Sequence, residues 1–265
     1  MSASAQLLIV AVVMLAVMTA GWAWQRRSRN AGIVDALWAG GLGAAAIFIA
    51  VTGQGAGAPR LALACLAGAW ALRLAVHIAA RLPAGEDGRY RYLRAHWQGH
   101  QGKFLGLFLA QALLVVIFSL PFAAVAANPA PAMAGTIGVA VLIWLVAVVG
   151  EGVADRQLAA HRADPAMRGR TCRRGLWRYS RHPNYFFEWL HWFVYPVLAL
   201  GSPLDWLAWS GPVLMYVFLN WLSGIPYTEA QALRSRGEDY RDYQRRTPRF
   251  FPGPPKASSR TTETL

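Results

Sequence analysis

Seven stretches of mostly apolar residues alternate with polar segments along the chain. Most of them reach the roughly 17–25 residues that a helix needs to cross a bilayer, and the sixth is shorter and rich in aromatic side chains. The pattern predicts an all-α, polytopic integral membrane protein with about seven transmembrane helices. These helices would form one domain, residues 1–252, followed by a disordered tail, residues 253–265. The apolar stretches cover residues 5–24, 33–53, 59–80, 104–127, 134–154, 185–200 and 206–224.

Positive charge is distributed unevenly along this pattern. The net charge is +13, and 24 of the 26 Lys and Arg residues follow the first, third, fifth and seventh apolar stretches. This alternation is the positive-inside pattern, so we expect the N-terminus outside and the C-terminus in the cytoplasm. The chain is 55% hydrophobic, with a mean hydropathy of +0.30. It leaves no soluble basic domain that would bind nucleic acid.

Residues 175–188, GLWRYSRHPNYFFE, place charged groups where an apolar helix is expected to begin. Proline is favoured at the first helical position, so Pro183 predicts a helix start with His182 as its cap. The first turn of a helix offers free backbone N–H groups, here beside Arg178 and Arg181. This combination predicts an anion site at a membrane surface.

Polar residues also recur along one face of that predicted helix. Asn184, Glu188 and His191 are spaced at i, i+4 and i+7 and therefore share a face, and Tyr185 follows Asn184 directly. Polar side chains in an apolar helix are costly unless they face protein or a ligand. We therefore expect this face to line a binding site.

A second polar face ends the fifth apolar stretch. Glu151, Asp155 and Arg162 share a face if the helix continues beyond the membrane. The arginines of the following segment could meet lipid phosphates. Taken as a set, with Asn184 and Glu188 nearby, they fit a phosphorylated ligand better, because guanidinium groups pair bidentately with phosphate. The further arginines are Arg168, Arg170, Arg173 and Arg174.

The segment 81–103 is dense in charged and aromatic residues, Glu86 and Tyr90 among them. It predicts either a salt-bridged surface loop or a second wall of the binding site. His96 and His100 form an H-x-x-x-H pattern typical of membrane di-iron enzymes. The chain has only six histidines, scattered along its length, so we expect no metal site.

Three parts of the sequence together resemble a known family. They are GLWRYSRHPNYFFEW, the earlier WALRL with GEDGRYRYLR, and the terminal GEDYRDYQRRTPRFFP. These segments resemble the steroid 5-alpha-reductase-like membrane proteins, and most closely a bacterial branch whose function is not established. That branch also shows a D-x-x-W pattern, here Asp35 and Trp38. The resemblance implies a seven-helix, multi-pass protein of the bacterial inner membrane.

The resemblance also implies an activity and a cofactor. The characterised reductases transfer hydride from NADPH to the carbon–carbon double bond of an enone. By resemblance, Asp155, Arg162 and Arg170 correspond to residues that hold the ribose and phosphates, and Asn184 and Glu188 to residues at the nicotinamide end. The expected cofactor-binding set is Asp155, Arg162, Arg170, Arg178, Arg181, His182, Asn184, Tyr185 and Glu188.

The substrate half of the predicted site has a weaker match. The steroid enzymes polarise the substrate carbonyl with a tyrosine and a Gln/Glu pair, which this sequence does not reproduce cleanly. We expect a tyrosine or a protonated carboxyl in that role, with Tyr90, Glu86 and Glu188 as the candidate catalytic residues. The expected partners are a lipophilic, steroid- or isoprenoid-like substrate and membrane lipids, with no nucleic acid and no obligatory protein partner.

Two alternatives stay open. Membrane methyltransferases of the isoprenylcysteine and phospholipid type share an R-H-P-x-Y segment, a following Glu and a similar C-terminal tail. Their ligand is S-adenosylmethionine, which has no phosphate, so the arginine-rich segment favours a dinucleotide. A non-catalytic lipid-binding membrane protein is the second alternative.

Overall fold

The computed structural model describes residues 1–130 and 134–256, and the elements within these ranges are helical. Contacts divide the chain into two compact units. The first contains Met1–Val141 and Phe193–Val213, and the second contains Leu142–Trp192 and the described residues from Leu214 onward. Of the tail predicted to be disordered, residues 257–265 lie outside the described part of the chain. The prediction of an all-helical membrane protein is confirmed in its coarse form.

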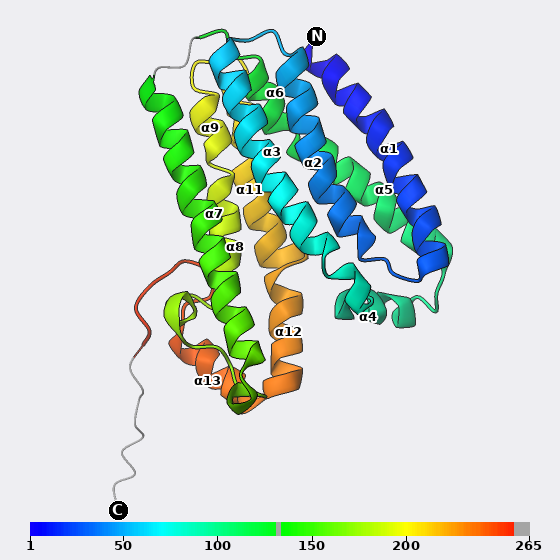
Figure 1. Cartoon of the computed structure of the whole chain (residues 1–265), viewed down its shortest axis with the longest axis vertical. Helices are drawn as coiled ribbons and strands as arrows, with labels where there is room; N and C mark the ends of the chain where they lie inside the picture. The colour runs from blue at the N-terminus through cyan, green and yellow to red at the C-terminus, as the bar shows by residue number, and fades with distance from the viewer. Residues whose placement is uncertain (131–133, 257–265) are drawn as a thin grey trace, which may run out of the picture. The chain divides into compact units, whose positions relative to one another are not determined.

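Helices of the first unit lie side by side (Figure 1). Helix α1 packs against α5 and α2 against α3, and Gly43 permits the second approach. A Cβ atom at Gly43 would lie 2.7 Å from the Cβ of Ala71. The helices are α1 (Ala3–Ser28), α2 (Ile33–Thr52), α3 (Gly57–Ala79), the 3₁₀ turn η1 (Leu82–Ala84), α4 (Gly88–His96), α5 (Gln101–Phe118), α6 (Leu120–Ala126), α9 (Val194–Leu198) and α10 (Asp205–Ala208).

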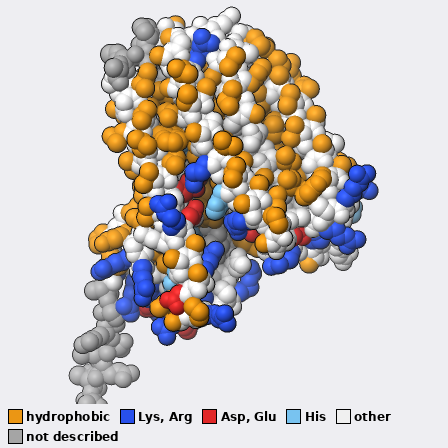
Figure 2. All heavy atoms as spheres, viewed as in Figure 1, with side chains coloured by type: hydrophobic (Ala, Val, Ile, Leu, Met, Phe, Trp, Pro, Cys, Tyr) orange, Lys and Arg blue, Asp and Glu red, His pale blue; other side chains and the backbone are white. Residues whose placement is uncertain are grey.

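Within the described part of the chain, five helical segments are long and apolar enough to cross a membrane. Their outward side chains are hydrophobic: Val51 is 71% exposed and Leu61 67%. Figure 2 shows such side chains covering the α1–α3 side of the first unit, with basic side chains gathered near α4. The five segments are α1, α2, Gly57–Ala84, Gln101–Ala126 and Gly135–Ala163.

The sixth and seventh predicted spans are broken into short helices. Residues 185–200 fall in α8 (Pro183–His191) and α9, and residues 206–224 in α10, α11 (Ser210–Val217) and the π-helix η4 (Phe218–Leu222). Proline explains the breaks, because it cannot donate a hydrogen bond to the carbonyl four residues earlier. Pro196 cannot donate to the carbonyl of Trp192, which follows α8, and Pro212 cannot donate to the carbonyl of Ala208, which ends α10. Pro226 likewise cannot donate to the carbonyl of Leu222, which ends η4.

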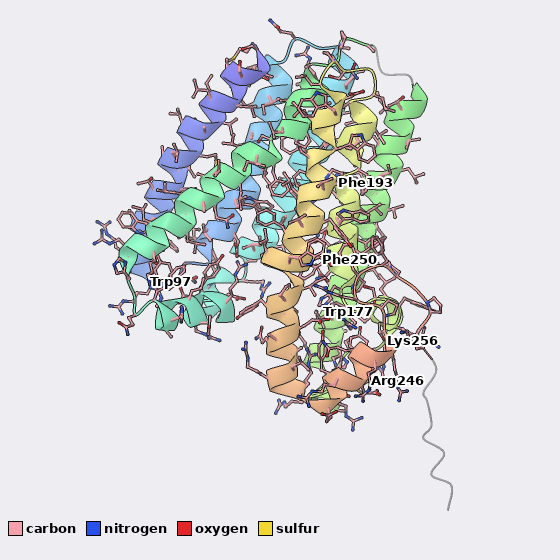
Figure 3. The ribbon with its side chains drawn as sticks, turned by 180° about the vertical axis from the view of Figure 1, so that it is seen from behind. Trp97, Trp177, Phe193, Arg246, Phe250 and Lys256 are labelled. Atoms are coloured by element: carbon pink, nitrogen blue, oxygen red, sulfur yellow. The ribbon has the colours of Figure 1, made fainter. Side chains whose placement is uncertain are left out.

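The second unit contains α8, α12 and α13 and the later part of α11. Helix α7 (Ala134–Ala163) begins in the first unit and ends in the second, followed by the 3₁₀ turns η2 (Pro165–Met167) and η3 (Gly175–Arg178). The chain after residue 224 forms α12 (Ile225–Arg236) and α13 (Glu238–Arg246). The Trp177 indole donates to the Ala154 carbonyl of α7 at 2.9 Å. Figure 3 shows Trp177 and Phe250 among the helices of this unit.

Candidate functional site

Helix α8 begins at Pro183, as the sequence predicts, and His182 occupies the N-cap position. The His182 side chain makes no capping hydrogen bond. Instead, Ser180 holds the turn: its Oγ accepts from the His182 backbone N–H at 3.1 Å and donates to the Phe250 carbonyl at 2.8 Å. The imidazole is therefore available for a partner elsewhere in the unit.

That partner is Glu229 on α12. Its Oε1 accepts from Arg181 Nε at 2.7 Å, from His182 Nε2 at 3.1 Å and from the Tyr240 hydroxyl at 3.3 Å. Its Oε2 accepts from Gln244 Nε2 at 2.9 Å. We call these five residues, Arg181, His182, Glu229, Tyr240 and Gln244, the Glu229 centre. They join the start of α8 to both C-terminal helices.

The charges of the Glu229 centre follow from its burial and partners. Burial raises the pKa of Glu229, but the hydrogen bond from His182 and the charge of Arg181 outweigh it and bring the pKa to about 2. Burial also lowers the pKa of His182, more than Glu229 raises it. His182 is therefore neutral at pH 7. An ionised carboxylate only accepts hydrogen bonds, so the His182 proton lies on Nε2.

Arg181 is satisfied within the protein. Its side chain is 11% exposed, and besides Glu229 it donates through one terminal nitrogen to the Gln244 and Thr247 carbonyls at 2.8 and 3.1 Å. Its backbone N–H donates to the Pro248 carbonyl at 2.9 Å. Arg181 thus clamps the segment after α13 against the start of α8.

Tyr185 adds a second tie between α8 and α12. Its ring stacks on the His182 imidazole with centroids 5.5 Å apart. Its hydroxyl lies 3.2 Å from Thr228 Oγ1, which donates its own proton to the Gly224 carbonyl at 2.9 Å. Tyr185 is therefore the donor to Thr228.

Helices α7 and α8 bring two of the predicted cofactor residues together. Asn184 Nδ2 donates to Asp155 Oδ1 at 3.2 Å. The helices approach closely at Gly150, where a Cβ atom would lie 2.4 Å from the Phe187 ring. One turn beyond Asn184, Glu188 accepts a 3.4 Å hydrogen bond from the Trp192 indole.

The segment between α7 and α8 contains two kinds of arginine. Arg173, like Arg181, is paired within the protein: it bonds Asp239 at 3.0 Å and Asp242 at 2.7 Å on α13. Arg168, Arg170, Arg174 and Arg178 are exposed, as is Arg162 near the end of α7, and within residues 1–130 and 134–256 these five have no ion-pair partner. His161 Nε2 lies 3.0 Å from the carbonyl of residue 170 and shapes this segment. The exposed predicted residues are Arg162, Arg170 and Arg178.

Glu86 and Tyr90 belong to the first unit, where an ion pair holds Glu86 and a hydrogen bond holds Tyr90. Glu86 pairs with Arg94 at 2.7 Å and accepts from the Ala31 N–H at 2.8 Å. Burial opposes its ionisation, but the hydrogen bonds from Arg94 and Ala31 lower its pKa below normal. The Tyr90 hydroxyl donates to Asp35 at 2.7 Å. Segment 81–103 is therefore salt-bridged, and the catalytic roles of Glu86 and Tyr90 stay predictions.

Comparison with known proteins identifies the family. A family model described as a protein of unknown function (DUF1295) matches residues 21–247. The chain belongs to the DUF1295 family. No curated protein matches it. No solved structure matches it. The match includes the whole Glu229 centre, so this centre lies in the part of the chain that the DUF1295 model describes.

Sequence reasoning missed three members of this DUF1295 site: Glu229, Tyr240 and Gln244. They lie in the C-terminal segment, where charged residues are common and no single carboxylate stands out. One usable signal is that Glu229 is the only acidic residue of α12. Among the described residues, no group of three or more His, Cys, Asp or Glu could hold a metal ion. The polar groups of the predicted site are instead exposed arginines and the hydrogen-bonded pair Asp155 and Asn184.

Proposed function

We propose that the protein is a membrane-embedded, NADPH-dependent reductase of an activated carbon–carbon double bond in a lipophilic, steroid- or isoprenoid-like substrate. The proposal includes relationship to the steroid 5-alpha-reductase-like proteins and seven membrane spans. It also places the N-terminus outside and the C-terminus in the cytoplasm, in a bacterial inner membrane. The residue patterns quoted above support it.

One observation carries the proposal. Asp155 and Asn184 meet across α7 and α8 at 3.2 Å. Arg162 in the last turn of α7, and Arg170 and Arg178 in the segment that joins the two helices, are exposed and have no carboxylate partner among the described residues. Guanidinium groups without carboxylate partners repel one another, so gathering them is costly unless a bound anion neutralises them. A ligand with several phosphates on one side and a carboxamide on the other matches this set of groups.

The proposal gives each residue a physical task. Arg162, Arg170 and Arg178 would bind phosphates through charge-assisted hydrogen bonds. Asp155 would accept from a ribose hydroxyl, and Asn184 with Glu188 would hold the carboxamide. NADPH, when bound, supplies the hydride. The Glu229 centre would not contact the cofactor itself. It would act indirectly, because it fixes the start of α8 and therefore the direction of Asn184.

The test is NADPH binding by purified protein in detergent, followed by the blue shift of the cofactor's fluorescence. Losing one charge-assisted hydrogen bond costs roughly 1.5–3 kcal/mol, so Arg162→Ala should weaken binding about ten- to a hundredfold. Arg168→Ala is the matched control, because Arg168 is an exposed arginine nearby in the sequence, in the segment that follows α7, and lies outside the proposed set. Equal losses in both variants would reduce the effect to general surface charge.

A methyltransferase that uses S-adenosylmethionine is the second candidate. The ion pairing of Arg173 and Arg181 favours it, because these two arginines are taken up inside the protein and fewer remain for phosphate. A thermal-shift comparison separates the two. Stabilisation by S-adenosylmethionine and not by NADPH would replace the reductase with the methyltransferase. No shift with either ligand would favour a non-catalytic lipid-binding protein.

A further inference from the structure

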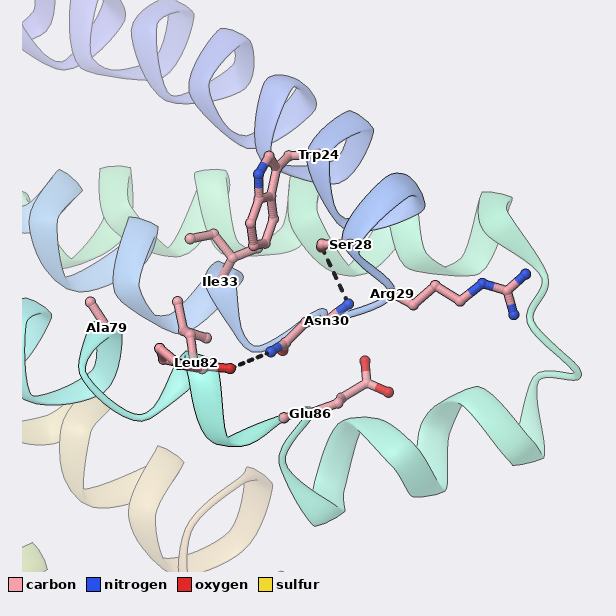
Figure 4. Close-up of a pocket in the computed structure, with 10 residues that line it drawn as sticks. Trp24, Ser28, Arg29, Asn30, Ile33, Ala79, Leu82 and Glu86 are labelled. Atoms are coloured by element: carbon pink, nitrogen blue, oxygen red, sulfur yellow. Dashed lines mark hydrogen bonds between the residues drawn. The ribbon is translucent and has the colours of Figure 1, made fainter.

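A pocket of about 690 Å³ opens in the first unit, at the ends of α1 and α3 (Figure 4). This volume lies within the range of small-molecule sites, roughly 300–1,000 Å³. One part of its lining is apolar and the other is polar. The lining residues are Trp24, Ser28, Arg29, Asn30, Ile33, Ala79, Leu82, Pro83, Gly85 and Glu86.

The pocket lies at the level where a membrane meets water. Helix α1 has 26 residues, and at about 1.5 Å per residue it is longer than a hydrocarbon core of about 30 Å. Its last turns carry Trp24, which is 47% exposed, and the exposed Arg26 and Arg27. Tryptophan and arginine at a helix end are typical of the headgroup region. The pocket therefore faces lipid headgroups and the upper part of their acyl chains.

The polar groups in the floor of the pocket are already satisfied. The Asn30 side chain donates to the Leu82 carbonyl at 3.1 Å and accepts from the Gly32 N–H at 3.0 Å. Ser28 Oγ accepts from the Asn30 N–H at 3.4 Å. Glu86 is neutralised by Arg94 through two hydrogen bonds, at 2.7 and 2.9 Å. The floor therefore offers a bound molecule few free hydrogen-bonding groups.

The rim of the pocket, in contrast, keeps an uncompensated positive charge. Arg29 is exposed and has no ion-pair partner among the residues that the structure describes. Figure 4 shows its side chain extending from the rim away from the apolar lining. Arg29 is the C-cap of α1 with φ 54°, so its backbone holds the side chain at this turn rather than along the helix. An apolar wall beside a free guanidinium complements an anionic amphiphile.

We propose that this pocket binds an anionic glycerophospholipid of the surrounding membrane. The phosphate lies at Arg29, and the glycerol and first acyl carbons lie against Trp24, Ile33 and Leu82. A soluble phosphate compound would gain the charge contact but would leave the apolar wall exposed to water. The pocket belongs to the first unit, so the lipid site stands whether or not the second unit binds NADPH.

Native mass spectrometry of the full chain in a neutral detergent, titrated with phosphatidylglycerol or phosphatidylcholine, tests the proposal. Phosphatidylglycerol should bind more tightly. Arg29→Gln should weaken its binding about fivefold, the effect of one arginine at an anionic lipid surface. Arg27→Gln is the matched control, because it removes the same charge two residues away without lining the pocket. It should change binding less than twofold.

A second variant tests the apolar wall. Ala79 is exposed at the end of α3, so Ala79→Phe fills the pocket without entering the core. It should lower phosphatidylglycerol binding while leaving the melting temperature and net charge unchanged. Equal losses for Arg29→Gln and Arg27→Gln, equal binding of the two lipids, or no loss for Ala79→Phe would each overturn the site.

Discussion

Glu229 offers the sharpest test of how the second unit is held together. Its side chain is 16% exposed and pairs with Arg181, which is 11% exposed. Replacing Glu229 by Ala leaves the guanidinium without its carboxylate. Removing one partner of a buried ion pair costs about 3–5 kcal/mol. Glu229→Gln keeps an acceptor oxygen and loses only the charge, so about 1.5–3 kcal/mol is expected.

The same residue predicts an acid dependence of stability. The folded pKa of Glu229 is about 2, below its ordinary value of 4.5. Its stabilising contribution is therefore complete above about pH 4.5 and is lost as the pH falls toward 2. The shift corresponds to about 3 kcal/mol, in line with the variant estimate. The stability difference between the parent protein and Glu229→Gln should shrink over this pH range.

Equilibrium unfolding in detergent micelles, followed by tryptophan fluorescence, measures both effects. Glu238→Gln is the control, because Glu238 starts the next helix and its pair with Arg241 is largely exposed, at 72% and 59%. Exposed pairs contribute less than about 1 kcal/mol. If Glu229→Gln unfolds no more easily than Glu238→Gln, the Glu229 centre does not stabilise the fold and the reasoning fails.

Two further predictions concern close packing in the second unit. Gly150→Ala should destabilise the protein by about 1–3 kcal/mol, because its Cβ would meet the Phe187 ring at 2.4 Å. A Cβ at Gly152 would meet no atom within 4 Å, so Gly152→Ala should be neutral or stabilising by up to about 1 kcal/mol. If thermal melting shows Gly152→Ala to be less stable than Gly150→Ala, the close contact between α7 and Phe187 is contradicted. Cys172 is 2% exposed, and burial raises its pKa. A water-soluble maleimide should label it slowly at pH 7 until the protein is unfolded, and labelling as fast as that of R168C would refute its burial.

Local sequence signals predicted the local parts of the site well. Proline at the first helical position located the start of α8 at Pro183, which is confirmed. The spacing of polar residues identified a face on α7 and a face on α8, and the hydrogen bond between Asp155 and Asn184 joins them. Both signals depend on neighbours within a few residues, where helix geometry fixes the side-chain directions.

Long-range pairing and helix breaks were harder to predict. Glu229 meets His182 across 47 residues, and no periodicity connects positions so far apart. The broken spans have a cause that is visible in the sequence, at Pro196 and Pro212. One proline hardly changes the hydropathy averaged over a window of residues, so the average still predicts a continuous span. The helix backbone nevertheless loses a hydrogen bond at each proline.

The separation between Arg181 and Glu229 also orders events during synthesis. The two residues are 48 positions apart, so at about 5–20 residues per second the carboxylate leaves the ribosome roughly two to ten seconds after the guanidinium. Until then the Arg181 guanidinium lacks the carboxylate that pairs with it in the folded protein. The second unit therefore cannot complete the Glu229 centre until α12 has been synthesised. A chain truncated before residue 229 would lack every ion pair and hydrogen bond that Glu229 makes to the start of α8.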